Sequence, residues 1–332
     1  MHIKKYRNIN NRFKSILIAT VEGYINTCSP VSSKYVQGRL PISLSTATIR
    51  NVMSILEKDG FLRQVHKSGG RIPTDLGYRF YIDSINFNKL FDNNTIDVLE
   101  RELKTISGNV DELLSATASM LSKVSSMFGV ITISEYHNSI LADIDLVELN
   151  KNRAMIVLAM DNGLVKSIVL NLDIEIAAKH IHSITELLRE KLRGLSLIEI
   201  QNTIFKRLND TKAIDHEIVQ ILINDCSKYF SIENNKLIYT SSYNVLLDQP
   251  EFKDIDNFQK ILPGLEKQFL NLYIEKSFNI DNKNDLIGKE NNNEIFNNCA
   301  FLTSKFESEA LSGRIGLIGP KRINYINMKS IL

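Results

Sequence analysis

Residues 44–82 read LSTATIRNVMSILEKDGFLRQVHKSGGRIPTDLGYRFYI, and this stretch decides how the N-terminal part of the chain folds. Its first segment repeats apolar side chains at the spacing of one helix face, so we expect a helix that buries them. These side chains are Ile49, Val52, Met53 and Leu56. Gly60 follows and can take the left-handed conformation that ends many helices. The stretch therefore begins with an amphipathic helix.

The second half of the stretch predicts a hairpin followed by another helix. Residues 61–65 have the composition of a strand, and Gly69 and Gly70 are typical of a flexible hairpin tip. Thr74 is the expected N-cap of a helix that continues to about Ile82. A hairpin with cations beside its tip suits contact with phosphates.

Two further helices are expected upstream of this stretch. Residues 12–26 place apolar side chains on one helical face, and Pro30 lies in the break that follows. Ser32 or Ser33 can cap a short helix over 34–39. The resulting order of three helices and a hairpin is typical of a winged helix-turn-helix, although the same elements also build protein-interaction domains.

The helix that begins near Ser45 carries the best candidates for contact with DNA. Arg50 and Asn51 face away from its apolar stripe, and such side chains can pair bidentately with guanine and adenine edges. We expect the hydroxyl residues before them, and the cations beside the glycine pair, to hold phosphates. The predicted DNA-binding residues are Ser45, Thr46, Thr48, Arg50, Asn51, Lys67, Ser68 and Arg71.

The distribution of charge supports a nucleic-acid partner for the N-terminal part. The whole chain has a formal net charge of +2. Residues 1–87 contain 13 Lys and Arg against 5 Asp and Glu, whereas the remaining residues contain 27 against 33. A small basic module on a mildly acidic body is expected when one end of a protein meets a polyanion.

Other classes of protein find little support in the sequence. With 332 residues the chain suits two or three domains, and it has no apolar run long enough to span a bilayer and no apolar leader, so we expect a cytoplasmic protein without a membrane partner. Cys28, Cys226 and Cys299 lack metal-ligand spacing, and His180 and His182 are two apart, which separates them around a helix. Phosphate-loop and dinucleotide motifs are missing. We therefore expect no enzyme, cofactor or metal.

The rest of the chain predicts an α+β domain interrupted by an insertion. A long helix is expected over 94–126. Strands are expected at 129–134, 144–149, 154–160, 164–170, 236–240, 286–288, 300–306 and 315–318, and helices at 176–192, 197–208, 215–229 and 258–278. Because strands precede and follow a helical block, the block is expected to interrupt the strand-rich domain.

Both ends of the chain resemble the HrcA family of heat-inducible transcription repressors. The resemblance is carried by PVSSK at 30–34, STATIRN at 45–51, SGGRIPTDLGYRFYID at 68–83, and GRIGLIGPKR at 313–322 followed by Tyr325. DNGLV at 161–165 and LRG at 192–194 add weaker similarity in the middle. The chain departs from the family pattern at Ser32, Val52, Ile55, Lys321, Ile323 and Asn324.

The resemblance implies an α+β architecture in which a winged helix precedes a GAF-like domain with an inserted, mainly helical dimerisation domain. The implied boundaries are 1–88 for the winged-helix DNA-binding domain, 89–127 for a linker helix, 128–172 with 281–332 for the GAF-like domain, and 173–280 for the dimerisation domain. Within the insertion, the helical block 173–230 is the expected interface between two copies.

The resemblance also implies a function, namely repression of heat-shock chaperone operons. A homodimer would bind an inverted-repeat operator in double-stranded DNA, and a chaperonin partner would maintain its activity. One alternative is a winged-helix regulator that senses a small molecule in the GAF-like domain. Another is an enzyme with an accessory nucleic-acid domain, against which the missing catalytic spacings argue.

Overall fold

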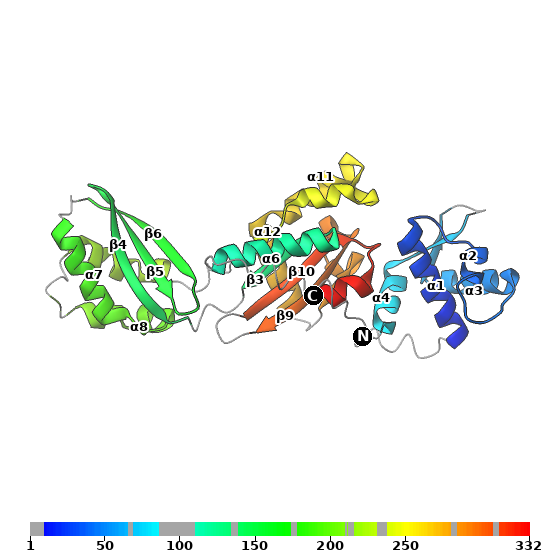
Figure 1. The fold of residues 1–332 in the computed structure, drawn as a ribbon, viewed down its shortest axis with the longest axis horizontal. Helices are drawn as coiled ribbons and strands as arrows, with labels where there is room; N and C mark the ends of the chain where they lie inside the picture. The colour runs from blue at the N-terminus through cyan, green and yellow to red at the C-terminus, as the bar shows by residue number, and fades with distance from the viewer. Residues whose placement is uncertain are drawn as a thin grey trace.

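Three units follow one another in a row in the computed structural model, as Figure 1 shows. The structure describes residues 10–65, 69–85, 110–133, 139–173, 178–209, 211, 216–230, 238–279, 284–307 and 312–332. We call the units the N-terminal unit, the central unit and the inserted unit. The central unit lies between the other two, so the N-terminal and inserted units are at opposite ends of the molecule (Figure 1).

The N-terminal unit contains three helices, a hairpin and a fourth helix, in the order that the sequence predicts. The elements are α1 (Asn11–Thr27), α2 (Ser33–Gln37), α3 (Thr46–Lys58), β1 (Leu62–Gln64), β2 (Arg71–Pro73) and α4 (Asp75–Ser84). Each helix begins where a side chain caps it: Asn10, Ser32, Ser45 and Thr74 accept hydrogen bonds from the first turns. Ser32, rather than Ser33, is the cap of the short second helix.

The central unit is built on a five-stranded antiparallel sheet with the strand order β7-β3-β10-β9-β8. Its main elements are α6 (Val110–Ser125), β3 (Phe128–Ile133), β7 (Ile238–Thr240), α11 (Ile255–Leu265), α12 (Lys267–Asn279), β8 (Asp285–Ile287), β9 (Cys299–Glu307), β10 (Ser312–Pro320) and α13 (Tyr325–Ile331). Short 3-10 helices link them, including η3 (Tyr243–Asp248), η4 (Pro250–Phe252), η5 (Gly288–Asn291) and η6 (Glu294–Phe296).

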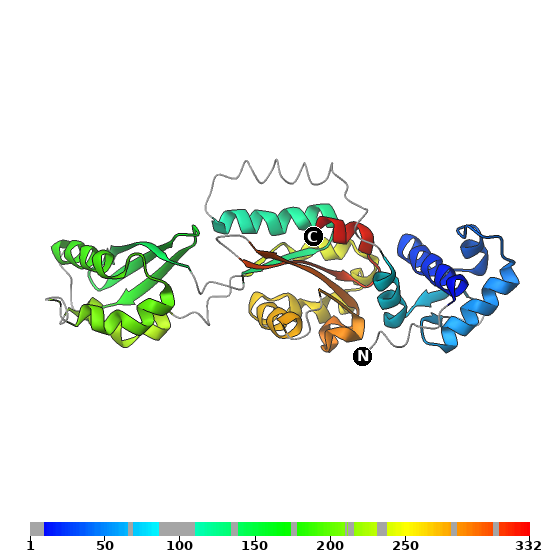
Figure 2. The same cartoon turned by 90° about the horizontal axis from the view of Figure 1, so that it is seen from below.

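Helices cover both faces of this sheet. Ile131 and Ile133 of β3 pack against Leu114 and Ala118 of α6, whereas Val130 packs in the cluster formed by α11 and α12. Figure 2 shows α6 on one face and the segment that contains α12 on the other. Every residue of β3 is consequently buried, which explains its almost continuous apolar sequence.

The inserted unit has its own three-stranded antiparallel sheet. It contains β4 (Leu141–Asn150), β5 (Arg153–Met160), β6 (Val165–Asn171), α7 (Ala178–Leu192), α8 (Leu197–Leu208), α9 (Glu217–Asn224) and α10 (Cys226–Tyr229). Alternate residues of β5, such as Ile156 and Leu158, pack in one core with Ile184 and Leu188 of α7. The helices cover one face of this sheet.

The strand pairing differs from the boundaries expected between the second domain and its insertion. The strands expected at 144–149, 154–160 and 164–170 belong to the range 128–172 implied for the GAF-like domain, but in the structure they form β4, β5 and β6, which pair only with one another in the described part of the chain. Conversely, β7, α11 and α12 fall within the range expected for the insertion, 173–280, but pack in the central unit. The insertion is therefore an α+β unit between β3 and β7. Strand periodicity does not specify which sheet a strand joins, so it could not correct the boundaries that the resemblance implies, and these differ from the observed topology.

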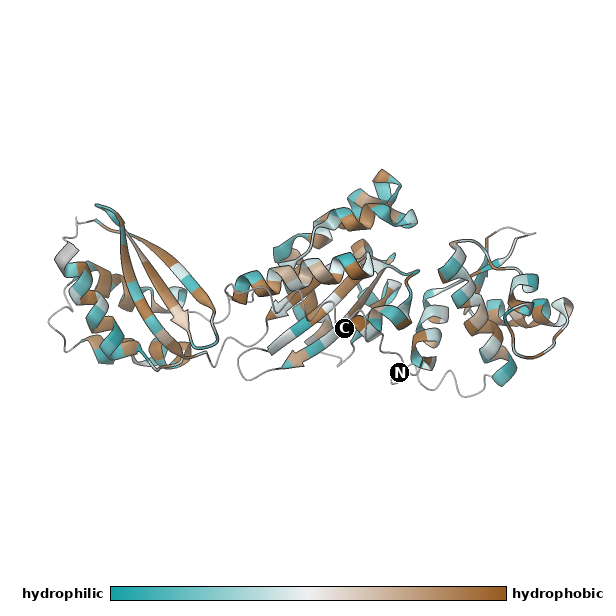
Figure 3. Cartoon of the chain, viewed as in Figure 1, coloured by the Kyte–Doolittle hydropathy of each residue, from teal (hydrophilic) through white to brown (hydrophobic). Residues whose placement is uncertain are grey.

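The long helix expected over 94–126 is observed in part. Helix α6 covers 110–125, while 86–109 lies outside the described residues. The single helix expected at 258–278 is divided into α11 and α12, which meet at Glu266. Within the described ranges, no helix is long and apolar enough to cross a membrane. Figure 3 shows that hydrophobic residues are concentrated along the strands of both larger sheets and on helix faces.

We predict that Gly129→Ala destabilises the central unit. A Cβ at Gly129 would lie 2.3 Å from the carbonyl oxygen of Ala118, so α6 would have to move away from β3. The expected loss is about 1–3 kcal/mol in urea-induced unfolding followed by circular dichroism. Gly38→Ala is the matched control, because its Cβ would lie 3.7 Å from the nearest atom. Equal stability of both variants would show that the contact between α6 and β3 is not tight.

Candidate nucleic-acid interface

The N-terminus of α3 brings three of the predicted residues together. The Ser45 hydroxyl accepts a 3.1 Å hydrogen bond from the Thr48 amide and shares a 2.8 Å hydrogen bond with the Thr48 hydroxyl. Thr46 is exposed at the first position of the helix. No acidic residue occupies this first turn. Helix N-termini attract anions through their unsatisfied amides, so this end of α3 suits a phosphate.

Arg50 and Asn51 lie on the exposed face of α3, one turn further along. Neither side chain forms a hydrogen bond or ion pair with another residue in the described part of the chain. The opposite face is buried in the core with α1, through Ile49, Val52, Met53 and Leu56. The packed face therefore fixes the helix, while the two polar side chains point to solvent.

Arg71 does not lie on the exposed surface as expected for a phosphate clamp. Its side chain is 11% exposed, and Nε donates to Glu57 Oε2 at 3.0 Å. A second donor, the Arg71 guanidinium NH2, bonds the Ser54 hydroxyl at 2.8 Å. Both partners are in α3, so Arg71 holds the hairpin against that helix. Glu57 neutralises the charge of Arg71.

The base of the hairpin packs closely against the segment before α2. Backbone hydrogen bonds of 2.9 Å run in both directions between Val31 and Arg71. A Cβ at Gly70 would lie 2.5 Å from the carbonyl oxygen of Val31, so a glycine is needed there for close approach. The remaining predicted hairpin residues, Lys67 and Ser68, lie outside the described residues.

Sequence reasoning left two exposed cations near α3 unassigned. Lys34 lies in the first part of α2, which packs against α3, and Arg39 follows α2. The Arg39 guanidinium carbon lies 5.4 Å from the centre of the Tyr35 ring. Both contribute to the basic charge of residues 1–87, and the packing of α2 against α3 brings them close to the exposed face of α3.

Helix α4 joins the N-terminal unit to the central unit. Tyr325 of α13 is completely buried, and its ring centre lies 6.0 Å from that of Tyr78 and 6.3 Å from that of Tyr81. Asp75 forms a 2.7 Å ion pair with Lys321. These contacts fix how α3 is presented relative to the body.

Two arginines strengthen this junction. Arg79 of α4 forms an ion pair with Glu290, and this carboxylate and its neighbours raise the pKa of Arg79 despite burial. Arg322 binds Glu251 at 2.7 Å and donates to the Ile25 carbonyl oxygen at 3.0 Å. The junction therefore combines buried rings with charge-assisted hydrogen bonds.

The described histidines and the two buried cysteines do not form a metal-binding cluster. No group of three His, Cys, Asp or Glu side chains in these ranges could hold a metal ion. His180 faces His216, with ring centres 5.9 Å apart, rather than His182. Burial raises the pKa of the Cys226 thiol and raises that of Cys299 to about 12. Both thiols are therefore protonated at neutral pH and poor nucleophiles.

Comparison with known proteins identifies relatives along nearly the full chain. Residues 111–328 match the family model "HrcA protein C terminal domain". The heat-inducible transcription repressor HrcA of Chlorobaculum tepidum is 31% identical, over 96% of this chain and 93% of its own. Its counterpart from Chlorobium luteolum is 30% identical, over 98% and 95%. A crystal structure of a hypothetical protein at 2.2 Å resolution shares the fold, with a TM-score of 0.61, 20% identity, and coverage of 97% and 95%.

We predict that Arg71→Ala lowers stability, because it leaves Glu57 and Ser54 without their shared partner. The expected loss is about 1–3 kcal/mol in urea-induced unfolding. Arg50→Ala is the matched control and should change stability by less than about 0.5 kcal/mol, since that side chain is exposed. An Arg71 variant with unchanged stability and weakened DNA binding would instead identify Arg71 as a phosphate contact.

Proposed function

The chain belongs to the HrcA family of heat-inducible transcription repressors, and we propose that it represses heat-shock chaperone operons by binding an operator in double-stranded DNA. The observation that carries the proposal is the exposed N-terminal face of α3, where an anion-attracting helix end lies beside the unpaired Arg50 and Asn51. We take the N-terminal unit as a winged helix-turn-helix and α3 as the helix that enters the major groove.

The proposed contacts divide into two kinds. Arg50 and Asn51 would contact base edges, since both can form two hydrogen bonds to one base. Ser45, Thr46 and Thr48 would bind phosphates at the helix N-terminus, and Lys67 and Ser68 would bind them along the hairpin. Lys34 and Arg39 are additional candidates for phosphate contact. Arg71 would act indirectly, by holding the hairpin against α3.

We propose that two copies bind together, because a two-fold symmetric protein matches an inverted-repeat operator. The helical block 173–230 is the interface expected from the sequence. Most of its described large apolar side chains pack inside the unit, although Ile198 and Phe205 of α8 are 40% and 61% exposed. Leu188, Leu192, Ile200 and Ile204 are all at most 2% exposed. The outer face of the β4–β6 sheet is a better candidate.

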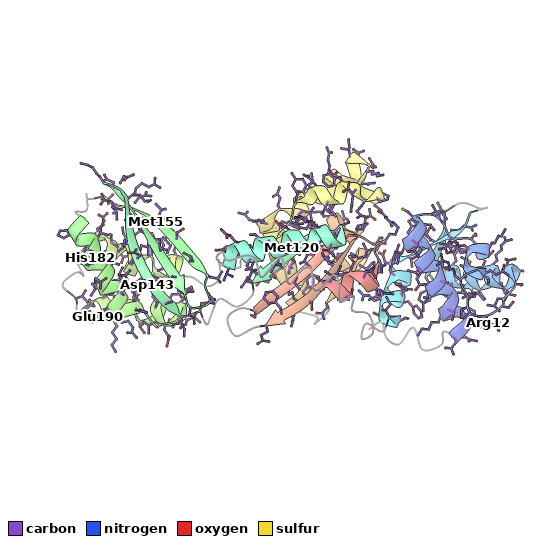
Figure 4. All side chains as sticks on the ribbon, viewed as in Figure 1. Arg12, Met120, Asp143, Met155, His182 and Glu190 are labelled. Atoms are coloured by element: carbon purple, nitrogen blue, oxygen red, sulfur yellow. The ribbon has the colours of Figure 1, made fainter. Side chains whose placement is uncertain are left out.

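The outer face of this sheet carries exposed apolar side chains, with Asp145 and Ser167 beside them opposite Val157, and no other described element covers it. Val147, Val165 and Val169 are 38%, 50% and 43% exposed. Pairing of Met155 with Val147 and Val169 places all three side chains in one row across the strands. Met155 is labelled on β5 in Figure 4. Apolar surface of this kind marks protein interfaces, and a second copy would cover it with the same face.

A chaperonin partner and a cytoplasmic location are part of the same proposal, and family membership is what supports them. Ile255 and Leu272, 69% and 55% exposed on α11 and α12, offer apolar surface suited to binding another protein.

We predict that Arg50→Ala costs about 1–3 kcal/mol of binding free energy at one base pair of each half-site. Binding to a series of single-base operator variants measures this, because removal of a base reader abolishes discrimination at its own position. Lys58→Ala, at the other end of α3, is the control and should leave the discrimination unchanged. Equal losses across all operator variants for Arg50→Ala would show that Arg50 does not read a base.

We predict that Val165→Asp with Val169→Asp converts the dimer to a monomer, because burying two carboxylates between sheets is unfavourable. Sedimentation at micromolar concentration measures the mass. Ile198→Asp is the control, since Ile198 is 40% exposed on α8. A monomeric wild type would contradict dimerisation, and dissociation by the Ile198 change alone would return the interface to the helical block.

A further inference from the structure

A cleft of about 730 Å³ lies where the N-terminal unit meets the central unit. Arg63 of β1, residues 72–76 and Tyr78 of α4 line one side. Residues from η4, α11, η5, η6 and the end of β10 line the other side. None of the lining residues belongs to α3, so the cleft is separate from the proposed DNA-reading face.

The inner wall of the cleft is apolar. Its accessible apolar side chains are the half-buried Tyr24 and Leu76 of the N-terminal unit and Ile295 of the central unit. Behind them lie the buried side chains of Ile72, Tyr78, Phe252 and Ile261. A buried apolar wall with a few polar groups at its edge is the usual composition of a small-molecule site, and such sites occur often between domains. The volume also falls within the range of roughly 300–1,000 Å³ typical of those sites.

Positively charged side chains outnumber negatively charged ones around the cleft. Lys321 and Arg322 are neutralised by Asp75 and Glu251. Three more cations, Arg63, Lys260 and Lys289, are exposed at the cleft and form no ion pair with a residue that the structure describes. Glu294 is the one remaining acidic residue among those lining the cleft.

The unpaired cations come from both units. Arg63 belongs to the N-terminal unit, whereas Lys260 and Lys289 belong to the central unit. Like charges on opposite walls repel one another, and an anion between them would replace this repulsion with two attractions. Its apolar portion would cover the half-buried side chains of Leu76 and Ile295.

We propose that the cleft binds a small organic anion that carries a phosphate or carboxylate group on an apolar or aromatic body. Because the ligand contacts both units, it stabilises one orientation of the N-terminal unit relative to the body. The ligand site stands independently of DNA binding, but a regulatory effect on operator affinity rests on the proposed function.

The test is calorimetric titration of the full-length protein with four probes. Adenosine monophosphate and 3-phenylpropionate combine an anionic group with an aromatic body, while adenosine and inorganic phosphate each supply one part. We expect saturable binding of at least one combined probe and weaker binding of the two single-part probes. Failure of both combined probes to bind at millimolar concentration would overturn the proposal.

Charge variants locate the binding. The double variant Lys260→Gln with Lys289→Gln should lower the affinity for the bound probe roughly tenfold, because two charge-assisted contacts are lost. Lys123→Gln with Lys206→Gln removes the same charge from exposed positions that do not line the cleft, and should have no effect. Unchanged affinity in the cleft variant would overturn the proposal.

Operator binding by the same variants, without a probe, distinguishes a free ligand from the phosphates of DNA. The cleft variant should bind the operator as the wild type does. A loss of operator affinity in the cleft variant alone would assign these lysines to the DNA backbone and overturn the small-molecule site. Failure of the wild type to bind any operator would contradict the proposed function but leave the calorimetric result valid.

Discussion

The packing of Tyr325 against α4 is the contact on which the arrangement of the whole chain depends. Its buried ring meets Tyr78 and Tyr81, and its hydroxyl donates a 2.6 Å hydrogen bond to the Lys321 carbonyl oxygen. Helix α4 also belongs to the N-terminal core, where Phe80 meets the ring of Phe61. One helix therefore contributes to two units, and the position of α3 is tied to that of the central sheet.

Because α4 connects two of the units, each of the three units has a distinct role in the proposed repressor. The N-terminal unit presents α3, the central unit holds it, and the inserted unit lies at the far end of the molecule (Figure 1). The uncovered face of its sheet carries the exposed side chains of Val147, Val165 and Val169. If two copies join through that face, the junctions at α4 determine how their two α3 helices are oriented. A ligand at the same junction would act on this orientation directly.

Local features of the sequence predicted local structure well. The stripe around Ile49, the cap at Ser45 and the break at Gly60 specify α3 from neighbouring residues alone. Contacts between residues far apart in the sequence could not be predicted from periodicity. The strand around Ile156 looks the same whether it joins the central sheet or its own, and the ion pair of Arg71 with Glu57 requires the hairpin to fold onto α3. A sequence therefore does not distinguish an arginine that is exposed, such as Arg50, from one that is held in an ion pair, such as Arg71.

Footprinting of the full-length protein on the promoters of its own chaperone genes tests the central claim most directly. The account predicts two protected half-sites related by a dyad, with centres about 10 base pairs or a multiple apart, as expected when two α3 helices enter successive major grooves. Protection of one asymmetric stretch, or none at protein concentrations that saturate a dimer, would contradict it.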